Sequence, residues 1–172
     1  MNPAVRAVII TSDSSILLTF QPDHGRRRFF IPGGSMERSD EGHRRTRLQK
    51  ELREELGLDV SRANMHELHP ITTGIRNHDL FFVSRVRGGI VRINPFDRSE
   101  PVLGLGFWGG GYRIPHELLT GHVAQLGDFY RKYPHLRGEV TEGLVIPEGL
   151  LRNRNTPIGV ISWDAQRRSW RV

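Results

Sequence analysis

Short apolar runs separated by polar turns open the chain and predict a β-rich first part. Residues 5–10 (VRAVII) and 16–20 (ILLTF) flank a polar turn at 12–14, and residues 29–31 (FFI) form a third run. Runs of this length, rich in β-branched and aromatic residues and bounded by turn residues, are typical of strands. The chain is therefore predicted to begin as a hairpin followed by a third strand.

A helical period replaces the strand pattern in the next segment. Leu48, Leu52 and Leu56 recur every four residues and so form an apolar stripe along one side of a helix. Gly57 follows this stripe directly and is a typical helix stop. The pattern predicts a helix that ends at Gly57 and buries its leucine side.

The remaining pattern predicts five more strands. They cover residues 68–74, 79–85, 90–93, 140–146 and 158–163. Residues 76–79 and 88–89 are interpreted as turns, and residues 94–101 as a loop.

Two later segments need a separate interpretation. Residues 103–112 (LGLGFWGGGY) hold five glycines, which indicates flexible or closely packed backbone. Phe107 and Trp108 project from it, and either pin the segment to the core or stack on a nucleobase. Residues 123–133 have a helical period, and this second helix is predicted to pack on the sheet face opposite the first.

Composition narrows the class of protein. A chain of 172 residues with 37% hydrophobic and 26% charged residues suits one globular domain. The absence of cysteine excludes disulfides, thiolate catalysis and cysteine-ligated zinc. No apolar run approaches the length that spans a bilayer, and no signal-peptide pattern is present, so a cytoplasmic protein without membrane contact is expected.

The predicted helix carries three carboxylates beside a glycine corner. Glu51, Glu54 and Glu55 fall on one side of the helix at spacings of three and four residues. Carboxylates this close repel one another, and a hard divalent cation such as Mg²⁺ relieves that repulsion. Gly33 and Gly34 lack side chains, so their backbone can approach an ion or a phosphate group. The pattern predicts a site for a metal and a phosphate.

The stretch from Ile31 to Leu58 resembles the signature box of the Nudix hydrolases. That box reads Gly, five residues, Glu, seven residues, Arg-Glu-apolar-any-Glu-Glu-any-Gly-apolar, and residues 50–58 (KELREELGL) fit its second half except that Lys50 replaces the Arg. Without gaps, Gly42 falls where the first Glu belongs. If Gly33-Gly34 is the corner, the loop is two residues longer than the pattern, and Asp40 or Glu41 stands in for that Glu.

The resemblance implies a fold and a reaction. The fold is an α/β class, a Nudix-type α/β/α sandwich with a mixed β-sheet between helices. The reaction is the Mg²⁺-dependent cleavage of a nucleoside diphosphate linked to another moiety, with Mn²⁺ as an alternative ion. The expected metal ligands are Glu51, Glu54, Glu55 and the carbonyl of Gly33. Glu51 would also act on the water, with Lys50 in the place of the arginine that steers it, and Glu100, or Asp97, would be the further acid.

Arginines supply the candidate substrate contacts. The 25 basic residues give a net charge of +6, which suits an anionic small-molecule nucleotide, and charge alone does not select nucleic acid. A guanidinium offers a planar fork of donors to phosphate oxygens. The candidates are Arg26, Arg28, Arg47 and Arg76. Arg47 lies four residues before Glu51, so it either pairs with the acids or reaches the substrate.

The domain organisation and two rival functions complete the prediction. Residues 1–172 are expected to form one domain, with a core over about 1–135 and a basic extension over 136–172. One rival is a catalytically impaired module that still binds a nucleotide. The other is a hydrolase directed to RNA by its basic tail. A homodimer is left open.

Overall fold

A central mixed sheet carries the predicted site. The computed structural model describes residues 2–93, 102–152, 162–164 and 169–171, and the order of the sheet is β4-β1-β7-β5. Its strands are β1 (Ala4–Val8), β4 (Gly33–Ser35), β5 (Met65–Glu67), β6 (Ile71–Thr73) and β7 (Arg76–Val83). β1 pairs in parallel with β7, and β5 and β6 pair with two different parts of β7. All of β1 is buried, because both faces of the sheet are covered.

A second sheet packs beside the first. Its order is β3-β2-β9, with β2 spanning Ile16–Asp23, β3 Arg26–Phe30 and β9 Gly104–Trp108. All of its pairs are antiparallel. The third strand predicted from the sequence is confirmed as β3. The hairpin predicted from residues 5–10 and 16–20 is present only at its turn, as a single bridge between Ile10 and Ile16, because β1 pairs with β4 and β7 whereas β2 belongs to the second sheet.

The glycine-rich segment is a strand at its start. Residues 104–108 form β9, and Phe107 is 2% exposed and packs on the ring of Tyr112, with the ring centroids 5.4 Å apart. Of the two alternatives that the glycines left open, closely packed backbone is the one seen for these five residues. Since Phe107 is buried, it pins the segment to the core and does not offer its face to a nucleobase.

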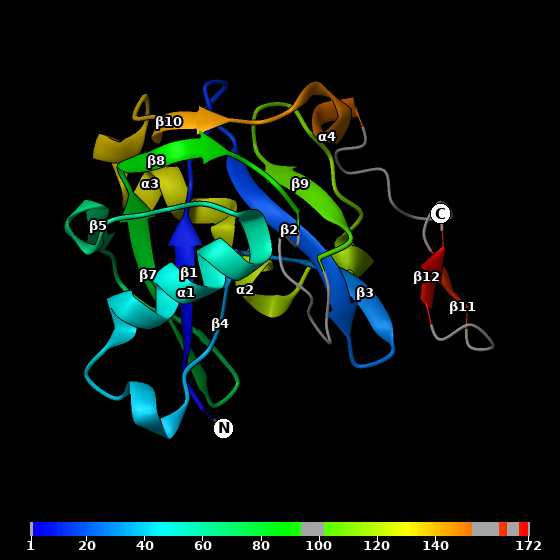
Figure 1. Cartoon of the computed structure of the whole chain (residues 1–172), viewed down its shortest axis with the longest axis horizontal. Helices are drawn as coiled ribbons and strands as arrows, with labels where there is room; N and C mark the ends of the chain where they lie inside the picture. The colour runs from blue at the N-terminus through cyan, green and yellow to red at the C-terminus, as the bar shows by residue number, and fades with distance from the viewer. Residues whose placement is uncertain (1, 94–101, 153–161, 165–168, 172) are drawn as a thin grey trace.

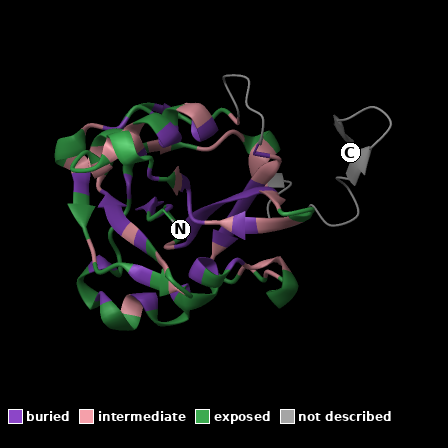
Figure 2. Cartoon of the chain, turned by 90° about the horizontal axis from the view of Figure 1, so that it is seen from below, coloured by how far each residue is buried: buried purple, intermediate pink, exposed green. Residues whose placement is uncertain are grey.

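The helix α1 (Arg44–Leu56) covers one face of the central sheet (Figure 1). Leu48, Leu52 and Leu56 are fully buried in the core on that face, as the period predicted. Gly57 ends the helix in the left-handed conformation at φ 65°, and its N–H donates to the last carbonyls. Figure 2 shows the buried residues between the layers of the fold.

Short helical segments cover the opposite face. They are η3 (His116–Leu118), α2 (Gly121–Ala124), η4 (Gln125–Asp128), α3 (Phe129–Lys132) and η5 (Pro134–Leu136). The single helix predicted over 123–133 is therefore wrong, although its apolar residues do pack in the core on that face. Many of those residues are three apart, which is also the period of a 3₁₀-helix.

The region after β7 differs from the prediction. β8 (Arg85–Ile90) runs straight through the glycine pair that was expected to be a turn, and the strand predicted over 90–93 is absent from the described residues. Residues 76–79, also predicted as a turn, are the first half of β7. Glycine suits position 89 within β8 because a Cβ there would lie 2.3 Å from the carbonyl oxygen of Gly143. The backbone around Gly143 therefore passes unusually close to β8.

The chain continues on the core beyond residue 136. β10 (Glu142–Val145) pairs in parallel with β8, and α4 (Glu148–Arg152) follows it. Thr141 is 1% exposed, accepts a hydrogen bond from the N–H of Ile10 at 3.0 Å and donates one to the carbonyl of Val83 at 2.7 Å. Residues 141–145 are thus attached to the central strands.

The remaining elements are minor. η1 (Arg38–Asp40) and η2 (Arg62–Asn64) flank α1, and β11 (Ser162–Asp164) pairs with β12 (Ser169–Arg171) near the C-terminus. The start of the strand predicted over 158–163 lies outside the described residues. No helix in the described part of the chain has the length and apolar character needed to cross a membrane.

Candidate functional site

The corner at Pro32-Gly33-Gly34 is fixed by its pairing with β1. Gly33 lies opposite Arg6 and Gly34 opposite Val5, and the carbonyl of Pro32 accepts a hydrogen bond from the N–H of Ala7 at 2.8 Å. Gly33 has φ 145°, and a Cβ there would lie 1.9 Å from the carbonyl oxygen of Val5. Only glycine fits such a backbone, so the corner passes directly over β1.

Two carboxylates of α1 are buried against this corner. Glu51 is 3% exposed and Glu55 is 1% exposed. A Cβ on Gly34 would lie 2.5 Å from the carboxyl carbon of Glu51, and the N–H of Gly33 donates to Glu55 Oε2 at 3.4 Å. The missing side chains of the corner therefore make room for the acids.

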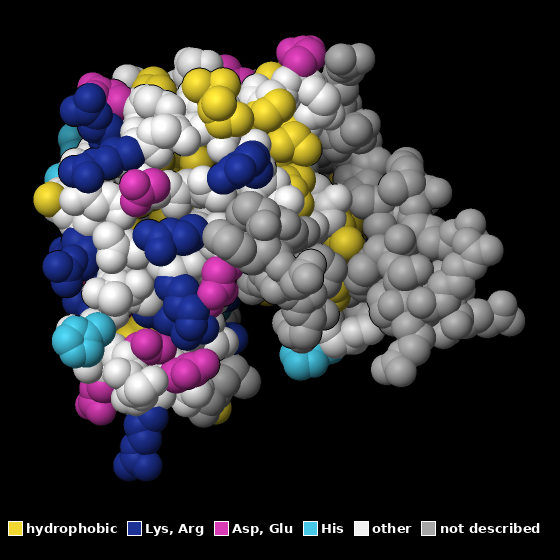
Figure 3. All heavy atoms as spheres, in the orientation of Figure 1, with side chains coloured by type: hydrophobic (Ala, Val, Ile, Leu, Met, Phe, Trp, Pro, Cys, Tyr) yellow, Lys and Arg dark blue, Asp and Glu magenta, His cyan; other side chains and the backbone are white. Residues whose placement is uncertain are grey.

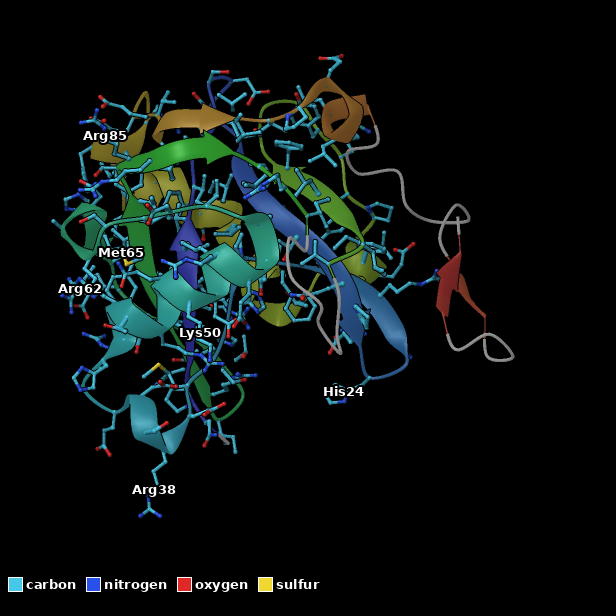
Figure 4. The ribbon with its side chains drawn as sticks, in the orientation of Figure 1. His24, Arg38, Lys50, Arg62, Met65 and Arg85 are labelled. Atoms are coloured by element: carbon cyan, nitrogen blue, oxygen red, sulfur yellow. The ribbon has the colours of Figure 1, made fainter. Side chains whose placement is uncertain are left out.

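The third carboxylate lies apart from these two. Glu54 is half-buried, and its Oε1 is 4.0 Å from Nζ of Lys50, whose side chain is 61% exposed (Figure 4). A pair this long and this exposed contributes little to stability. Lys50 thus pairs with Glu54, whereas the sequence prediction had placed it beside Glu51.

Arg47 is a basic residue that contacts Glu51. Its NH2 group lies 2.7 Å from Glu51 Oε1, and its NH1 group lies 3.6 Å from Asp40 and 3.7 Å from Glu37. The side chain of Arg47 is 13% exposed. Of the two roles that the sequence left open for Arg47, pairing with the acids is the one seen in the structure.

The donor set suits a hard divalent cation by its chemistry. Two buried carboxylates, a third acid on the next turn of the helix and a glycine corner are oxygen-rich surroundings of the kind that Mg²⁺ favours. Within residues 2–93 and 102–152, however, no three His, Asp or Glu side chains converge closely enough to hold a metal ion.

A buried arginine lies on the other side of the corner, where the sequence prediction had placed none. Arg6 is 3% exposed, its Nε donates to His78 Nδ1 at 3.3 Å, and its NH1 donates to the carbonyl of Ile31 at 3.1 Å. Burial lowers the pKa of Arg6 to about 10, against the opposing influence of the charge on Glu55. Arg6 therefore stays charged at neutral pH. The signal for it was a lone charge inside the apolar run VRAVII.

Two buried histidines, also missed, extend this network. The rings of His78 and His122 are 4.6 Å apart, and His122 Nε2 accepts a hydrogen bond from the N–H of Ile31 at 3.1 Å. His78 Nε2 lies 2.8 Å from Thr73 Oγ1. Burial, followed by the charge on Arg6, lowers the pKa of His78 to about 4 and that of His122 well below its ordinary value. Both rings are neutral at pH 7. His122 bonds Ile31, the residue before the corner, directly, and His78 is connected to Ile31 through Arg6.

The other predicted substrate contacts lie at separate places. Arg76, on β7, donates a hydrogen bond to Ser35 Oγ on β4, and burial lowers its pKa. Arg28 Nε is 3.7 Å from Asp23 within the β2–β3 hairpin, and Arg26 is exposed at the same hairpin. Glu100 and Asp97 lie outside the described residues. Figure 3 shows Lys and Arg side chains lying between acidic ones on the face that carries α1.

The arginines in the first turn of α1 have anionic or aromatic partners. Arg44 NH1 lies 2.7 Å from Glu67 and 3.4 Å from Asp79. Arg45 donates to the carbonyl of Met65 at 3.2 Å and lies over the ring of Phe81, 4.9 Å from its centre. Positive charge at a helix N-terminus opposes the helix dipole, and these contacts offset that cost.

The comparisons with known proteins concern the fold. No protein-family model matches the sequence, and no curated protein sequence matches it either. Among solved structures, the chain is similar to a MutT structure from work on Aliivibrio salmonicida and Vibrio cholerae, at 22% identity and a TM-score of 0.51, over 73% of this chain and 95% of that one. It is also similar to a putative nudix hydrolase family member from Chromobacterium violaceum, at 21% identity and a TM-score of 0.51, over 83% of this chain and 82% of that one.

A third similar structure contains a metal and a nucleotide. It is a bifunctional NMN adenylyltransferase/ADP ribose pyrophosphatase from Francisella tularensis complexed with AMP and a Mn ion. The identity is 16% and the TM-score 0.53, over 77% of this chain and 41% of that one. With its mixed sheet, its covering helices and these structural relatives, the chain has the Nudix fold.

Proposed function

We propose that this protein is a divalent-metal-dependent hydrolase that cleaves a nucleoside diphosphate linked to another moiety. The observation that carries the proposal is the burial of Glu51 and Glu55 against the Gly33-Gly34 corner. Buried carboxylates are costly unless they are compensated, and such groups concentrate at functional sites. Gly34 leaves open the space that the Glu51 carboxylate occupies, so helix and corner fit each other as one site.

The residues proposed to hold the ion are Glu51, Glu54, Glu55 and the carbonyl of Gly33. Mg²⁺ is the proposed ion and Mn²⁺ the alternative. When bound, such an ion neutralises phosphate oxygens and makes water a better nucleophile. The Mn ion and AMP in the Francisella structure support this choice of ion and of nucleotide.

The chain's own residues supply orientation and charge. Glu51 is the proposed acceptor of the water's proton, because it is the buried acid nearest to Gly34. Arg76, which lies beside Ser35 at the end of β4, is proposed to contact a phosphate group. Arg26 and Arg28, on the β2–β3 hairpin, are proposed to contact the part of the substrate beyond the phosphates.

The test is hydrolysis of a panel of nucleoside diphosphate derivatives with Mg²⁺ or Mn²⁺, with a chelator as the blank. We expect mononucleotide or phosphate release that stops when the chelator is added. Glu54→Gln and Glu55→Gln should each lower kcat by about 100-fold or more, since each removes a negative charge from the proposed ion. Glu139→Gln, at an exposed position away from α1, is the matched control and should retain full turnover. Near-normal turnover in Glu55→Gln would refute the assignment.

A nucleotide-binding module without hydrolysis is the second candidate. One contact favours it, which is the ion pair between Arg47 and Glu51, because the carboxylate proposed for catalysis already has a cation. The same panel separates the two candidates. Saturable nucleotide binding without turnover, with either ion, selects the module.

A further inference from the structure

Arg47 holds the carboxylate on which the proposed metal site depends. Its guanidinium lies 2.7 Å from Glu51 Oε1, and both side chains are nearly buried. An ion pair this short and this little exposed is screened far less than a surface pair. In this state of the protein, the negative charge of Glu51 is compensated by the chain itself.

A guanidinium and a divalent cation compete for the same oxygen atoms. Both need the lone pairs of the Glu51 carboxylate, and the two positive charges repel each other across a short distance. A metal ion that binds Glu51 therefore has to displace Arg47 or share the carboxylate with it. Either event lowers the affinity of the site for the ion.

The structure provides a second set of partners for the displaced guanidinium. Asp40 and Glu37 lie 3.6 Å and 3.7 Å from NH1 of Arg47, while its NH2 contacts Glu51. Asp40 accepts a hydrogen bond from the N–H of Glu37 at 2.9 Å, which fixes the two acids relative to each other. Arg47 would therefore keep two carboxylate partners if a cation took its place on Glu51.

We propose that Arg47 is a built-in competitor for the divalent cation, which it keeps weakly bound by occupying Glu51, and that it gives up Glu51 and stays paired with Asp40 and Glu37 when the cation binds. This inference rests on the proposed function, because it assumes a metal site at Glu51. Arg47 is a positioning residue in this scheme, since it acts through Glu51. The absence of a positive charge at position 47 should make the site bind metal more tightly.

The experiment is a titration of the protein with Mn²⁺, in which free Mn²⁺ is followed by electron paramagnetic resonance. The variant is Arg47→Met, which keeps most of the buried stem and removes the charge. We expect Mn²⁺ to bind at least about 10-fold more tightly than in the wild type, equivalent to about 1.4 kcal/mol. Arg53→Met removes the same charge from an exposed position on α1, and its Mn²⁺ affinity should stay within about 2-fold of the wild type.

A second variant tests the same idea in the opposite direction. Glu37→Gln combined with Asp40→Asn removes the acids that are proposed to receive Arg47, so Mn²⁺ should bind more weakly than in the wild type. Because the loss of two acids also weakens Mn²⁺ binding by charge alone, the double variant is compared in the wild-type and Arg47→Met backgrounds, and its effect should be clearly smaller in Arg47→Met. Unchanged Mn²⁺ affinity in Arg47→Met, or in the double variant if Arg47→Met fails to fold, overturns the inference.

The outcomes also separate this inference from the proposed function. If wild type and Arg47→Met bind Mn²⁺ with equal affinity and both show metal-dependent turnover, the inference about Arg47 is wrong and the proposed hydrolase function stands. If only Arg47→Met binds Mn²⁺ tightly and neither protein shows turnover, the inference about Arg47 is supported and the proposed hydrolase function is wrong. If neither protein binds Mn²⁺, both are wrong.

Discussion

Two glycine clusters look alike in the sequence and differ in what surrounds them. At the Gly33-Gly34 corner, an added Cβ would meet the backbone of Val5 at 1.9 Å or the carboxylate of Glu51 at 2.5 Å. At Gly109 to Gly111 the nearest atom to an added Cβ is 3.2 Å away, and at Gly111 nothing lies within 4 Å. The first cluster is glycine because other groups pass against it, in addition to the positive φ of Gly33, whereas the second is glycine because its backbone turns with positive φ at all three residues. Only the first cluster makes room for the carboxylates of the proposed site.

The largest expected effect comes from Gly33→Ala. The new Cβ would collide with the backbone of β1, which cannot move without breaking the sheet. We expect the free energy of unfolding to fall by more than about 4 kcal/mol, or the protein not to fold. Gly111→Ala, at φ 85° with open space around it, should cost only about 1–2 kcal/mol. Urea unfolding of the two variants gives the comparison, and equal losses would contradict it.

Gly34→Ala should separate function from stability. Its Cβ would meet the carboxylate of Glu51, which is the end of a flexible side chain and can move aside. We therefore expect kcat to fall by about 10-fold or more, with a much smaller loss of stability than in Gly33→Ala. Gly111→Ala is the control for turnover. Full activity in Gly34→Ala would show that the position of Glu51 against the corner has no role in the reaction.

The two regions should also lose stability in different ranges of pH. On the corner side, the pKa of His78 is about 4 in the folded protein and about 6.5 when unfolded, so the unfolded state binds more protons between these values. Stability from the neutral ring is present above pH 6.5 and is lost as the pH falls toward 4. His78→Gln should flatten the unfolding free energy in that range, as measured by urea titrations at several pH values.

Beside the second glycine cluster, Gly109 to Gly111, the group whose protonation changes stability is Asp13, which accepts a hydrogen bond from Tyr112. Burial alone would raise its pKa, but hydrogen bonds from Ser15, Thr11 and Tyr112 offset this and lower the pKa to about 2. The stability that the Asp13 carboxylate contributes is therefore present above pH 3.8 and is lost as the pH falls toward 2.

The smallest expected effect comes from Tyr112→Phe, which deletes the 2.8 Å hydrogen bond to Asp13 at the surface. The free energy of unfolding should fall by at most about 1 kcal/mol. Turnover should not change, and a loss of activity would connect this turn to the site.

The sequence predicted the parts of the fold that depend on local periodicity. The leucine stripe of α1 and its stop at Gly57 follow from spacing alone, and the structure has them. The first hairpin was predicted in the same way, but β1 and β2 part into two sheets beyond the bridge at Ile10 and Ile16. The strand character of Gly104–Trp108 could not be found this way. Its glycines allow many conformations, and it is a strand because β2 supplies hydrogen-bonding partners from far along the chain.

The candidate site also has a part that the sequence predicted and a part that it missed. The acids and the corner were predicted because they lie within one short stretch of sequence. Arg6 and His122 were missed, because their roles arise only when β1 and α2 meet the segment before the corner. The predicted ligand and substrate roles stay predictions until the experiments above are done.

The parallel pairing of β1 with β7 has a consequence for synthesis on the ribosome. The first strand cannot gain this neighbour until residues 76–83 have been made, because the partners are more than 70 positions apart. At about 5–20 residues per second, the amino-terminal segment waits several seconds in an incomplete state. Its apolar surface is exposed to other chains during that interval, so a slow stretch of translation before residue 76 should increase aggregation of the newborn protein.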